Sequence, residues 1–320
     1  MKLLFIALTA AGLVSTPLFA NDDRLRQQAT ALFGVLPDTM PGAESDTPAM
    51  VELGRQLFMD KRLSINDSQS CNTCHNVMDS GPGVDNLPTS PGALGELGDR
   101  NSPSVWNAGF HIAQFWDGRE KDLESQAKGP ILNPIEMAMP DEETVISKLS
   151  AIEGYPDAFD HAFGVNGSLT YDNVANAIAA FERTLITRDR FDEFQRGDNA
   201  ALTEQEKRGL STFINVGCAA CHSGPLLGGN SYFKVGIVEP FPNQQDLGRY
   251  EVTGEDSDKM VFKTSALRDI GRTAPYFHDG SVETLEIAVA DMARMQLGRT
   301  LTEENVEDIT AFLRALDHQF

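Results

Sequence analysis

Two short motifs combine cysteine and histidine at a fixed spacing. Both read C-x-x-C-H, one in each half of the chain, and together they contain all 4 cysteines. Two thiols three positions apart can add to the two vinyl groups of a haem, and the histidine that follows then points its imidazole at the iron. The motifs therefore predict two covalently attached haem c groups. The attachment cysteines and proximal iron ligands are Cys71, Cys74, His75, Cys218, Cys221 and His222.

Three other uses of the same cysteines have to be weighed. A thioredoxin-like redox pair needs a βαβ context, and a zinc site needs the two pairs to converge on one metal ion. Two disulfides suit an exported chain with an even number of cysteines, but they leave both following histidines without a role. Haem attachment gives every residue of both motifs a role, so it is the leading interpretation.

The first 20 residues have the pattern of a secretory signal peptide. Lys2 precedes an apolar run from Leu3 to Leu13, and the small residue Ala20 stands before the polar Asn21. An uncleaved membrane anchor is the alternative, but the apolar run is too short to span a bilayer. We therefore predict a signal peptide over residues 1–20 and a periplasmic protein with no membrane span.

Acidic residues dominate the charge of the 320-residue chain. The sequence has 26 lysines and arginines against 47 aspartates and glutamates, which gives a formal net charge of −21. Nucleic acids and anionic membranes bind clustered cationic side chains, so this balance argues against both as partners. It favours a basic or dipolar protein partner, whose encounter with the acidic surface depends on salt.

Helical periodicity recurs along the chain, whereas strand-like alternation is best developed at Tyr232 to Val238. Apolar residues keep one face across Tyr171 to Thr187, and again in a helix that begins near Thr302. A capping box starts a further helix at Thr203, with Glu206 as its third helical residue. The fold class is therefore predicted to be mainly α.

A weak internal repeat precedes the two haem motifs. Gly54 and Phe58 lie before the first motif, and Gly209 and Phe213 lie before the second at the same mutual spacing. Two copies of one small helical unit that binds haem explain this repeat.

Irregular segments rich in glycine and proline follow each motif, at residues 76–100 and 224–258. Loops of this length are usually functional or mobile. A polar stretch at residues 188–199 is interpreted as the linker between the two halves.

Beyond these patterns, the chain resembles the bacterial di-haem cytochrome c peroxidases over nearly its whole mature sequence. Besides the haem motifs, the matching segments are Arg100–Pro103, Ala113–Arg119, Gln126–Pro130, Glu136–Met137, Gly154–Pro156, Thr273–His278 and Gln296–Gly298. The resemblance implies two cytochrome c-like haem domains packed together with long irregular loops. The peroxidatic domain would span residues 21–190 and the electron-transfer domain residues 191–320, with the option that the C-terminal helix packs on the N-terminal domain.

The resemblance also implies roles at the peroxidatic haem. Glu136 matches the distal carboxylate of the family, which takes a proton from one peroxide oxygen and returns it to the other. Gln126 would support the same pocket, and Trp116 matches an aromatic residue between the haems that helps electrons cross. Without the resemblance, Glu136 would be interpreted as a solvated surface acid and Trp116 as a core residue.

Further ligands follow from the same resemblance. Met292 matches the sixth ligand of the C-terminal iron, although Met295, one turn further on, competes with it, and a methionine is ordinarily core filler. A thioether ligand raises the haem potential relative to a second histidine. Asn101, Thr273 and Pro275 match positions that hold a calcium ion between the domains, and their oxygens suit that cation.

One departure from the family concerns the loop after the first motif. Many members carry a histidine there, between two glycines, which blocks the peroxidatic iron until the other haem is reduced. This chain has Ala93 at that position, and an alanine cannot ligate iron. The resemblance thus predicts a peroxidase that is competent in its fully oxidised form, with Met78 and His111 as candidate substitute ligands. His278 has no assigned role, and His318 is predicted to be exposed.

The implied function is the reduction of hydrogen peroxide to water, with electrons from a small donor protein such as a cytochrome c or a cupredoxin. One alternative is a di-haem oxidase of the type that matures quinone cofactors in a partner protein. That type has a tyrosine where this chain has Met292. The other is a di-haem electron carrier, in which Glu136 would be idle. Family members are often dimers, so a homodimer is a further expectation.

Overall fold

The computed structural model describes residues 18–318, so the predicted signal peptide lies outside the described residues except for its last three positions. The helices are α1 (Leu18–Phe33), α2 (Pro48–Met59), α3 (Cys71–Cys74), α4 (Leu123–Leu132), α5 (Glu142–Ser150), α6 (Tyr155–Phe163), α7 (Tyr171–Glu182), α8 (Arg190–Gln195), α9 (Glu204–Val216), α10 (Tyr250–Thr253), α11 (Leu285–Leu297) and α12 (Glu303–Arg314). Short 3-10 turns span Ala43–Ser45, Lys61–Leu63, Met78–Ser80, Ala108–Phe110, Cys218–Ala220, Asp256–Asp258 and Ile270–Arg272. Strand β1 (Tyr232–Lys234) pairs antiparallel with β2 (Val261–Lys263). The prediction of a mainly α fold is confirmed.

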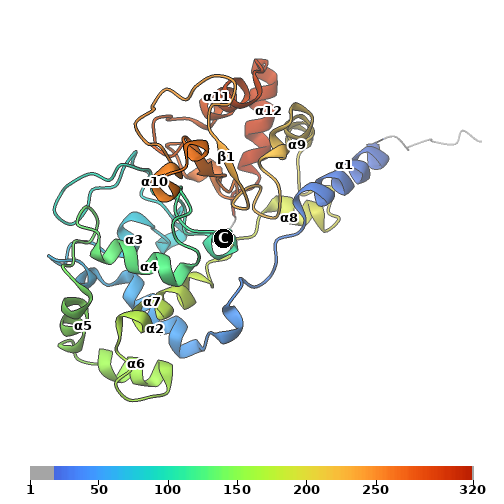
Figure 1. Ribbon diagram of the computed structural model, residues 1–320. Coiled ribbons are helices and arrows are strands. Elements are labelled where there is room, and N and C mark those ends of the chain that lie inside the picture. Colours follow the sequence, from blue (N-terminus) through green and yellow to red (C-terminus); the bar gives the residue numbers. More distant parts are fainter. Residues whose placement is uncertain (1–17, 319–320) are drawn as a thin grey trace, which may run out of the picture.

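Two hydrophobic cores organise the chain into two halves (Figure 1). The first core joins α2 with α4 to α7 around the fully buried Phe58 and Phe159. The second joins α8, α9, α11 and α12 around Phe191 and Phe312. Each half contains one C-x-x-C-H motif, and Cys71 packs against the first core while Cys218 packs against the second.

The structure departs from the predicted domain boundaries at the N-terminal end of the described chain. Helix α1 packs with the second half, because Phe33 is buried with its ring 5.9 Å from that of Phe191. Figure 1 shows α1 beside α8, away from α2 and α7. Helix α12 packs mainly on α9 and α11 of its own half, where the predicted boundaries place it, rather than on the N-terminal half. It is His318, after this helix, that reaches the first half and packs against the Trp106 ring.

The internal repeat corresponds to one helix crossing that occurs twice. Helix α2 crosses α7 at Gly54, where a Cβ would lie 1.8 Å from the carbonyl oxygen of Ala177. Helix α9 crosses α12 at Gly209, where a Cβ would lie 1.8 Å from the carbonyl oxygen of Asp308. Glycine is therefore required at both positions, because the backbones of the paired helices touch.

Replacing either glycine by alanine is expected to destabilise the protein by about 3 kcal/mol, the upper end of the usual cost of overpacking a core. The added methyl group meets rigid backbone, so the helices must separate. Urea unfolding of the haem-loaded Gly54→Ala and Gly209→Ala variants measures the loss. Gly129→Ala is the matched control, because a Cβ there lies 3.8 Å from Phe115, an ordinary contact. Equal stability of all three variants would contradict the close backbone contact at Gly54 and Gly209.

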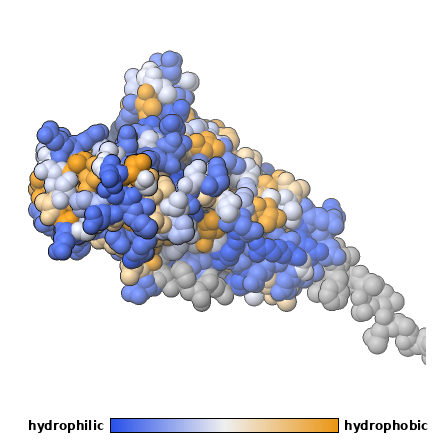
Figure 2. Space-filling model, turned by 90° about the horizontal axis from the view of Figure 1, so that it is seen from below, coloured by the Kyte–Doolittle hydropathy of each residue, from blue (hydrophilic) through white to orange (hydrophobic). Residues whose placement is uncertain are grey.

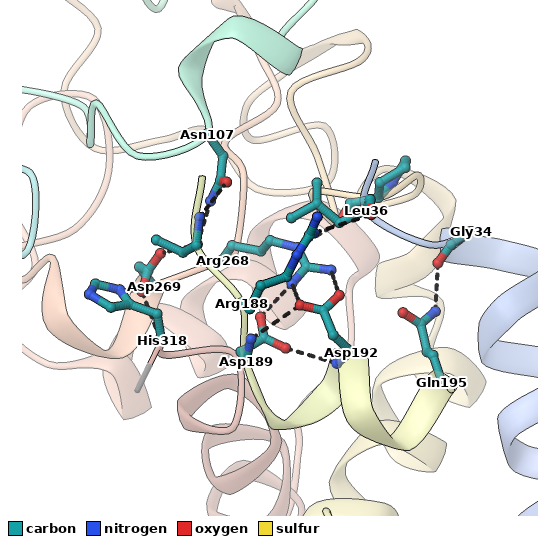
Figure 3. A network of polar contacts seen from close by, with 12 residues as sticks. Gly34, Leu36, Asn107, Arg188, Asp189, Asp192, Gln195, Arg268, Asp269 and His318 are labelled. Atoms are coloured by element: carbon teal, nitrogen blue, oxygen red, sulfur yellow. Dashed lines mark hydrogen bonds and ion pairs between the residues drawn. The ribbon is translucent and has the colours of Figure 1, made fainter. Parts of the chain in front are cut away.

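The segment predicted to be a polar linker is a buried junction instead (Figure 3). Arg268, which is 4% exposed, donates hydrogen bonds to Asp189 and Asp192 at the start of α8. Its charge needs both carboxylates because burial removes water from it. The segment is polar, as an exposed linker would be, but its buried carboxylates are paired with Arg268 inside the protein.

A second part of this junction ties the two halves together. Asn107 donates to Thr187 at 2.6 Å, and Thr187 donates to Asp269 at 2.9 Å (Figure 3). Asp269 also accepts a hydrogen bond from the backbone N–H of His318 at 2.9 Å. The prediction that His318 is exposed is wrong, because its ring is buried against Asp269 and Trp106.

Figure 2 shows a face that is largely hydrophilic, with apolar residues scattered over it. Within residues 18–318, none of the helices has both the length and the apolar character needed to cross a membrane.

Candidate active site

The first C-x-x-C-H motif opens into a cavity of about 790 Å³. Cys71, Cys74 and His75 all line this cavity. The side chains of Ser70 and Thr73 form a capping box at the start of α3, and the N–H of His75 donates to the carbonyl of Cys71 at 2.9 Å. One short helical turn therefore presents both thiols and the imidazole to the same space. We call it the first cavity.

Glu136 and Gln126 lie in the wall of the first cavity. The Glu136 carboxylate accepts a hydrogen bond of 2.7 Å from the side-chain amide of Asn133. Burial raises the pKa of Glu136, while this hydrogen bond and the positive charge of Arg119 act in the opposite direction. Because its pKa is raised, Glu136 binds a proton more strongly than an exposed carboxylate does. Asn133 and Arg119 limit this rise by stabilising the deprotonated form that can accept a proton.

Asn133→Ala is expected to shift the acid limb of the pH profile of peroxide turnover to higher pH. The variant removes the hydrogen bond that stabilises the carboxylate form, so the pKa of Glu136 rises further. Because a base must be deprotonated to act, activity then disappears at a higher pH as the solution is acidified. The measurement is kcat/KM against pH. Asn215→Ala, an exposed site on α9, is the control, and a superimposable profile for Asn133→Ala would contradict the contact.

The second C-x-x-C-H motif lines a different cavity, of about 180 Å³, which we call the second cavity. Gly217, with φ of 111°, ends α9 and directs the chain into the turn that carries Cys218. The Nδ1 atom of His222 lies 3.1 Å from the carbonyl oxygen of Leu227. This contact makes Nδ1 the donor, so Nε2 is the nitrogen that can ligate a metal.

The structure separates the two candidate methionines of α11. Met292 lines the second cavity together with His222. Met295 is 2% exposed and packs in a small core with Phe241 and Phe262. Of the two, Met292 has the position from which a ligand could reach the second cavity.

Trp116 lies where the two cavities meet, because it lines both of them. Its indole N–H donates to the carbonyl of Asn101 at 2.9 Å, and its own carbonyl accepts from the backbone N–H of Lys263 at 2.7 Å. Lys263 also lines both cavities. This second boundary residue was missed in the sequence, because a single lysine carries no motif.

Of the residues predicted to bind calcium, Asn101 lines the first cavity, whereas Thr273 and Pro275 line neither cavity. The backbone N–H of Asn101 donates to the carbonyl of His278 at 2.7 Å, which places Asn101 beside the segment that contains Thr273 and Pro275. The Asn101 amide donates to the carbonyl of Leu87. No group of three or more histidine, cysteine or acidic residues suited to a metal ion is found within residues 18–318.

The loop that carries Ala93 is docked against the catalytic candidate. The N–H of Ala93 donates to the backbone carbonyl of Glu136 at 2.6 Å, and the Asn66 amide donates to the carbonyl of Ala93. A Cβ on Gly92 would lie 1.8 Å from the carbonyl oxygen of Ile135, so this approach requires glycine. The loop therefore forms a fitted wall of the first cavity.

The two candidate substitute ligands have other surroundings. Met78 is 51% exposed and is not part of either cavity wall within the described chain. His111 lines the first cavity, but its Nδ1 atom lies 3.1 Å from the amine of Lys263 and its Nε2 atom is buried beside Gly229.

The residues of both cavities fit a covalently bound haem better than the other uses of the cysteines. No disulfide joins any of the four cysteines, which argues against the disulfide interpretation. The two motifs line separate cavities and do not converge, so they do not form one zinc site. Burial lowers the pKa of His75 and of His222, which keeps both imidazoles in the neutral form that binds iron.

Comparisons with known proteins agree with this geometry. A family model described as di-haem cytochrome c peroxidase matches residues 48–200. The cytochrome c551 peroxidase of Pseudomonas aeruginosa is 47% identical over 311 residues, which span 94% of this chain and 88% of that protein. The chain belongs to the di-haem cytochrome c peroxidase family. The cytochrome c551 peroxidase of Nitrosomonas europaea is 45% identical, over 83% of this chain and 79% of that protein.

A solved structure supports the same family at the level of the fold. A MauG-like protein associated with microbial copper homeostasis superposes with a TM-score of 0.77 at 27% identity, over 89% of this chain and 94% of that chain. Membership of the di-haem cytochrome c peroxidase family implies two haem c groups and confirms that the chain is an enzyme of the peroxidase class.

Proposed function

We propose that the chain reduces hydrogen peroxide to two waters at the first cavity, with electrons that enter at the second. The observation that carries this proposal is the presence of a half-buried carboxylate, Glu136, in the same cavity wall as His75. When bound, haem c supplies an iron centre that takes up and passes on single electrons. The residues that would hold it are the two cysteines and the histidine of each motif.

The chain's own contribution at the first cavity is the movement of protons. Reduction of one peroxide consumes two electrons and two protons and releases two waters. Glu136 takes the proton from one peroxide oxygen and returns it to the other, which then leaves as water. Asn133 orients the carboxylate, and Gln126 supplies a further polar group in the same wall.

Electrons would enter through the half that contains His222 and Met292, and Trp116 supports their passage because it lines both cavities. We propose a periplasmic cytochrome c or cupredoxin as the donor, consistent with the net charge of −21 and the N-terminal signal pattern. A calcium ion bound by Asn101, Thr273 and Pro275, and a homodimer, remain parts of the proposal that rest on the family resemblance.

We further propose that the enzyme needs no reductive activation. Ala93 offers no ligand to iron, and its backbone is bound to that of Glu136. The loop that carries a blocking histidine in relatives therefore serves here as part of the wall around the catalytic carboxylate.

Mixing the fully ferric enzyme with a small excess of peroxide tests this directly. We expect the haem absorption spectrum to change within the mixing time of a stopped-flow instrument, because no ligand has to leave first. A matched sample with the second haem reduced beforehand should react at a similar rate. A ferric enzyme that stays silent until one electron is added would disprove the proposal.

A further inference from the structure

Lys263 is a buried cation at the boundary of the two cavities. It ends strand β2, lines both cavities and is 7% exposed. Burial lowers the pKa of Lys263 to about 8, and the nearby negative charge of Asp117 acts in the opposite direction. Burying an ammonium group is costly unless anions or strong acceptors surround it.

The protein supplies only a weak partner for this charge. The amine lies 3.1 Å from Nδ1 of His111, and burial together with the charge of Lys263 lowers the pKa of His111 well below its usual value. His111 is therefore a neutral acceptor. Lys263 makes no ion pair with any residue in the described range 18–318. The carboxylate of Asp117 is instead bound by Arg100 and Arg119.

The chemistry of the bound cofactor indicates what completes this site. Thioether bonds at the cysteines fix the vinyl side of each haem, and each haem also carries two carboxylate groups. These carboxylates are the anions that enter the cavities with the cofactor, and an ammonium group pairs with them through charge-assisted hydrogen bonds.

We propose that Lys263 is a cationic anchor for haem carboxylates, shared by the two cavities, and that its charge raises the potentials of both haems. The proposal rests on the placement of one haem in each cavity, as in the proposed function. A positive charge favours the reduced state because reduction adds an electron nearby. The same residue is joined to Trp116 by a backbone hydrogen bond, so the anchor and the boundary tryptophan are held as one unit.

Redox titration of the haem-loaded protein tests the proposal. The variants are Lys263→Gln and Lys263→Met, which remove the charge, and Lys263→Arg, which keeps it. Lys234→Gln is the matched control, because Lys234 lies exposed on the paired strand β1 and outside both cavity walls. Visible spectra at fixed applied potentials give the ratio of reduced to oxidised haem, and the pyridine haemochrome spectrum gives the haem content of the same samples.

In the neutral variants, we expect this ratio to fall about tenfold for both haems, which corresponds to about 59 mV for a one-electron couple. Lys263→Arg and Lys234→Gln should stay within about threefold of the parent protein. Loss of haem in both neutral variants but not in Lys263→Arg would also support the anchor. Unchanged ratios at either haem in a fully loaded neutral variant, or an arginine variant that behaves like the neutral ones, would overturn it.

Peroxide turnover of the parent protein is measured separately, so that the two proposals can fail independently. Shifted potentials in a protein that consumes no peroxide would retain the anchor and reject the proposed function. Normal peroxide turnover by the parent protein, together with unshifted potentials in the neutral variants, would retain the proposed function and reject the anchor.

Discussion

Glu136→Gln is expected to lower kcat/KM for hydrogen peroxide by about 10²–10⁴-fold, the usual contribution of a positioned acid or base. The amide is close in shape to the carboxylate, but it cannot accept the proton of the peroxide. Haem content and the spectra of the resting haems should be unchanged. Steady-state peroxide consumption with an excess of reduced donor provides the measurement.

Glu182→Gln is the matched control, because Glu182 is a second carboxyl group in the wall of the same cavity and is itself buried. Burial raises its pKa to about 8, so it is mostly protonated at neutral pH and cannot serve as the base there. We expect its replacement to leave turnover within about tenfold of the parent protein, since no proton acceptor is lost. A larger effect at Glu182 than at Glu136 would show that the base has been assigned to the wrong carboxyl group.

The same pair of variants distinguishes a peroxidase from a protein that only carries electrons. An electron carrier would consume little peroxide and would respond to neither substitution. A peroxidase in which Glu136 moves the proton loses turnover at that position while its haems remain reducible by the donor.

Features that depend on residues adjacent in the chain were the ones predictable from the sequence. The C-x-x-C-H motifs are local, and their presence in two separate cavities follows from the cysteine spacing and the two cores. The capping box at Thr203 was likewise local and begins α9 as predicted. The glycine repeat was visible in the sequence, but its reason was not, because the contact partner of Gly54 lies in α7.

Features that depend on distant contacts were beyond the reach of sequence patterns. In the sequence, Asp189 and Asp192 have the character of linker residues. Their role depends on hydrogen bonds from Arg268, which lies 76 to 79 residues later in the chain. Lys263 has an ordinary sequence context, and its importance arises because two cavities meet at its side chain. Helix α1 is separated from its partners by the whole first half, so nothing near Phe33 in the sequence reveals where it packs.

Met292→Leu is expected to remove the thioether from the second cavity and to lower donor-driven peroxide turnover by at least tenfold. A thioether ligand raises the haem potential, so its loss makes the haem a poorer electron acceptor. The measurements are the potential of the second haem and the steady-state rate with reduced donor. Leucine is similar in volume to methionine and costs less than about 1.5 kcal/mol of stability, so a change in rate is not a sign of unfolding.

Met295→Leu is the matched control, on the same helix and one turn further on. Met295 packs among Phe241 and Phe262, so its replacement should affect stability slightly and leave the haem potential unchanged. Met292→His then separates ligation from potential: a histidine keeps two strong ligands on the iron but lowers the potential. If Met292→His behaves like the parent protein, occupation of the sixth position suffices. If it behaves like Met292→Leu, the potential itself controls electron entry. A loss at Met295 alone would contradict the assignment of Met292.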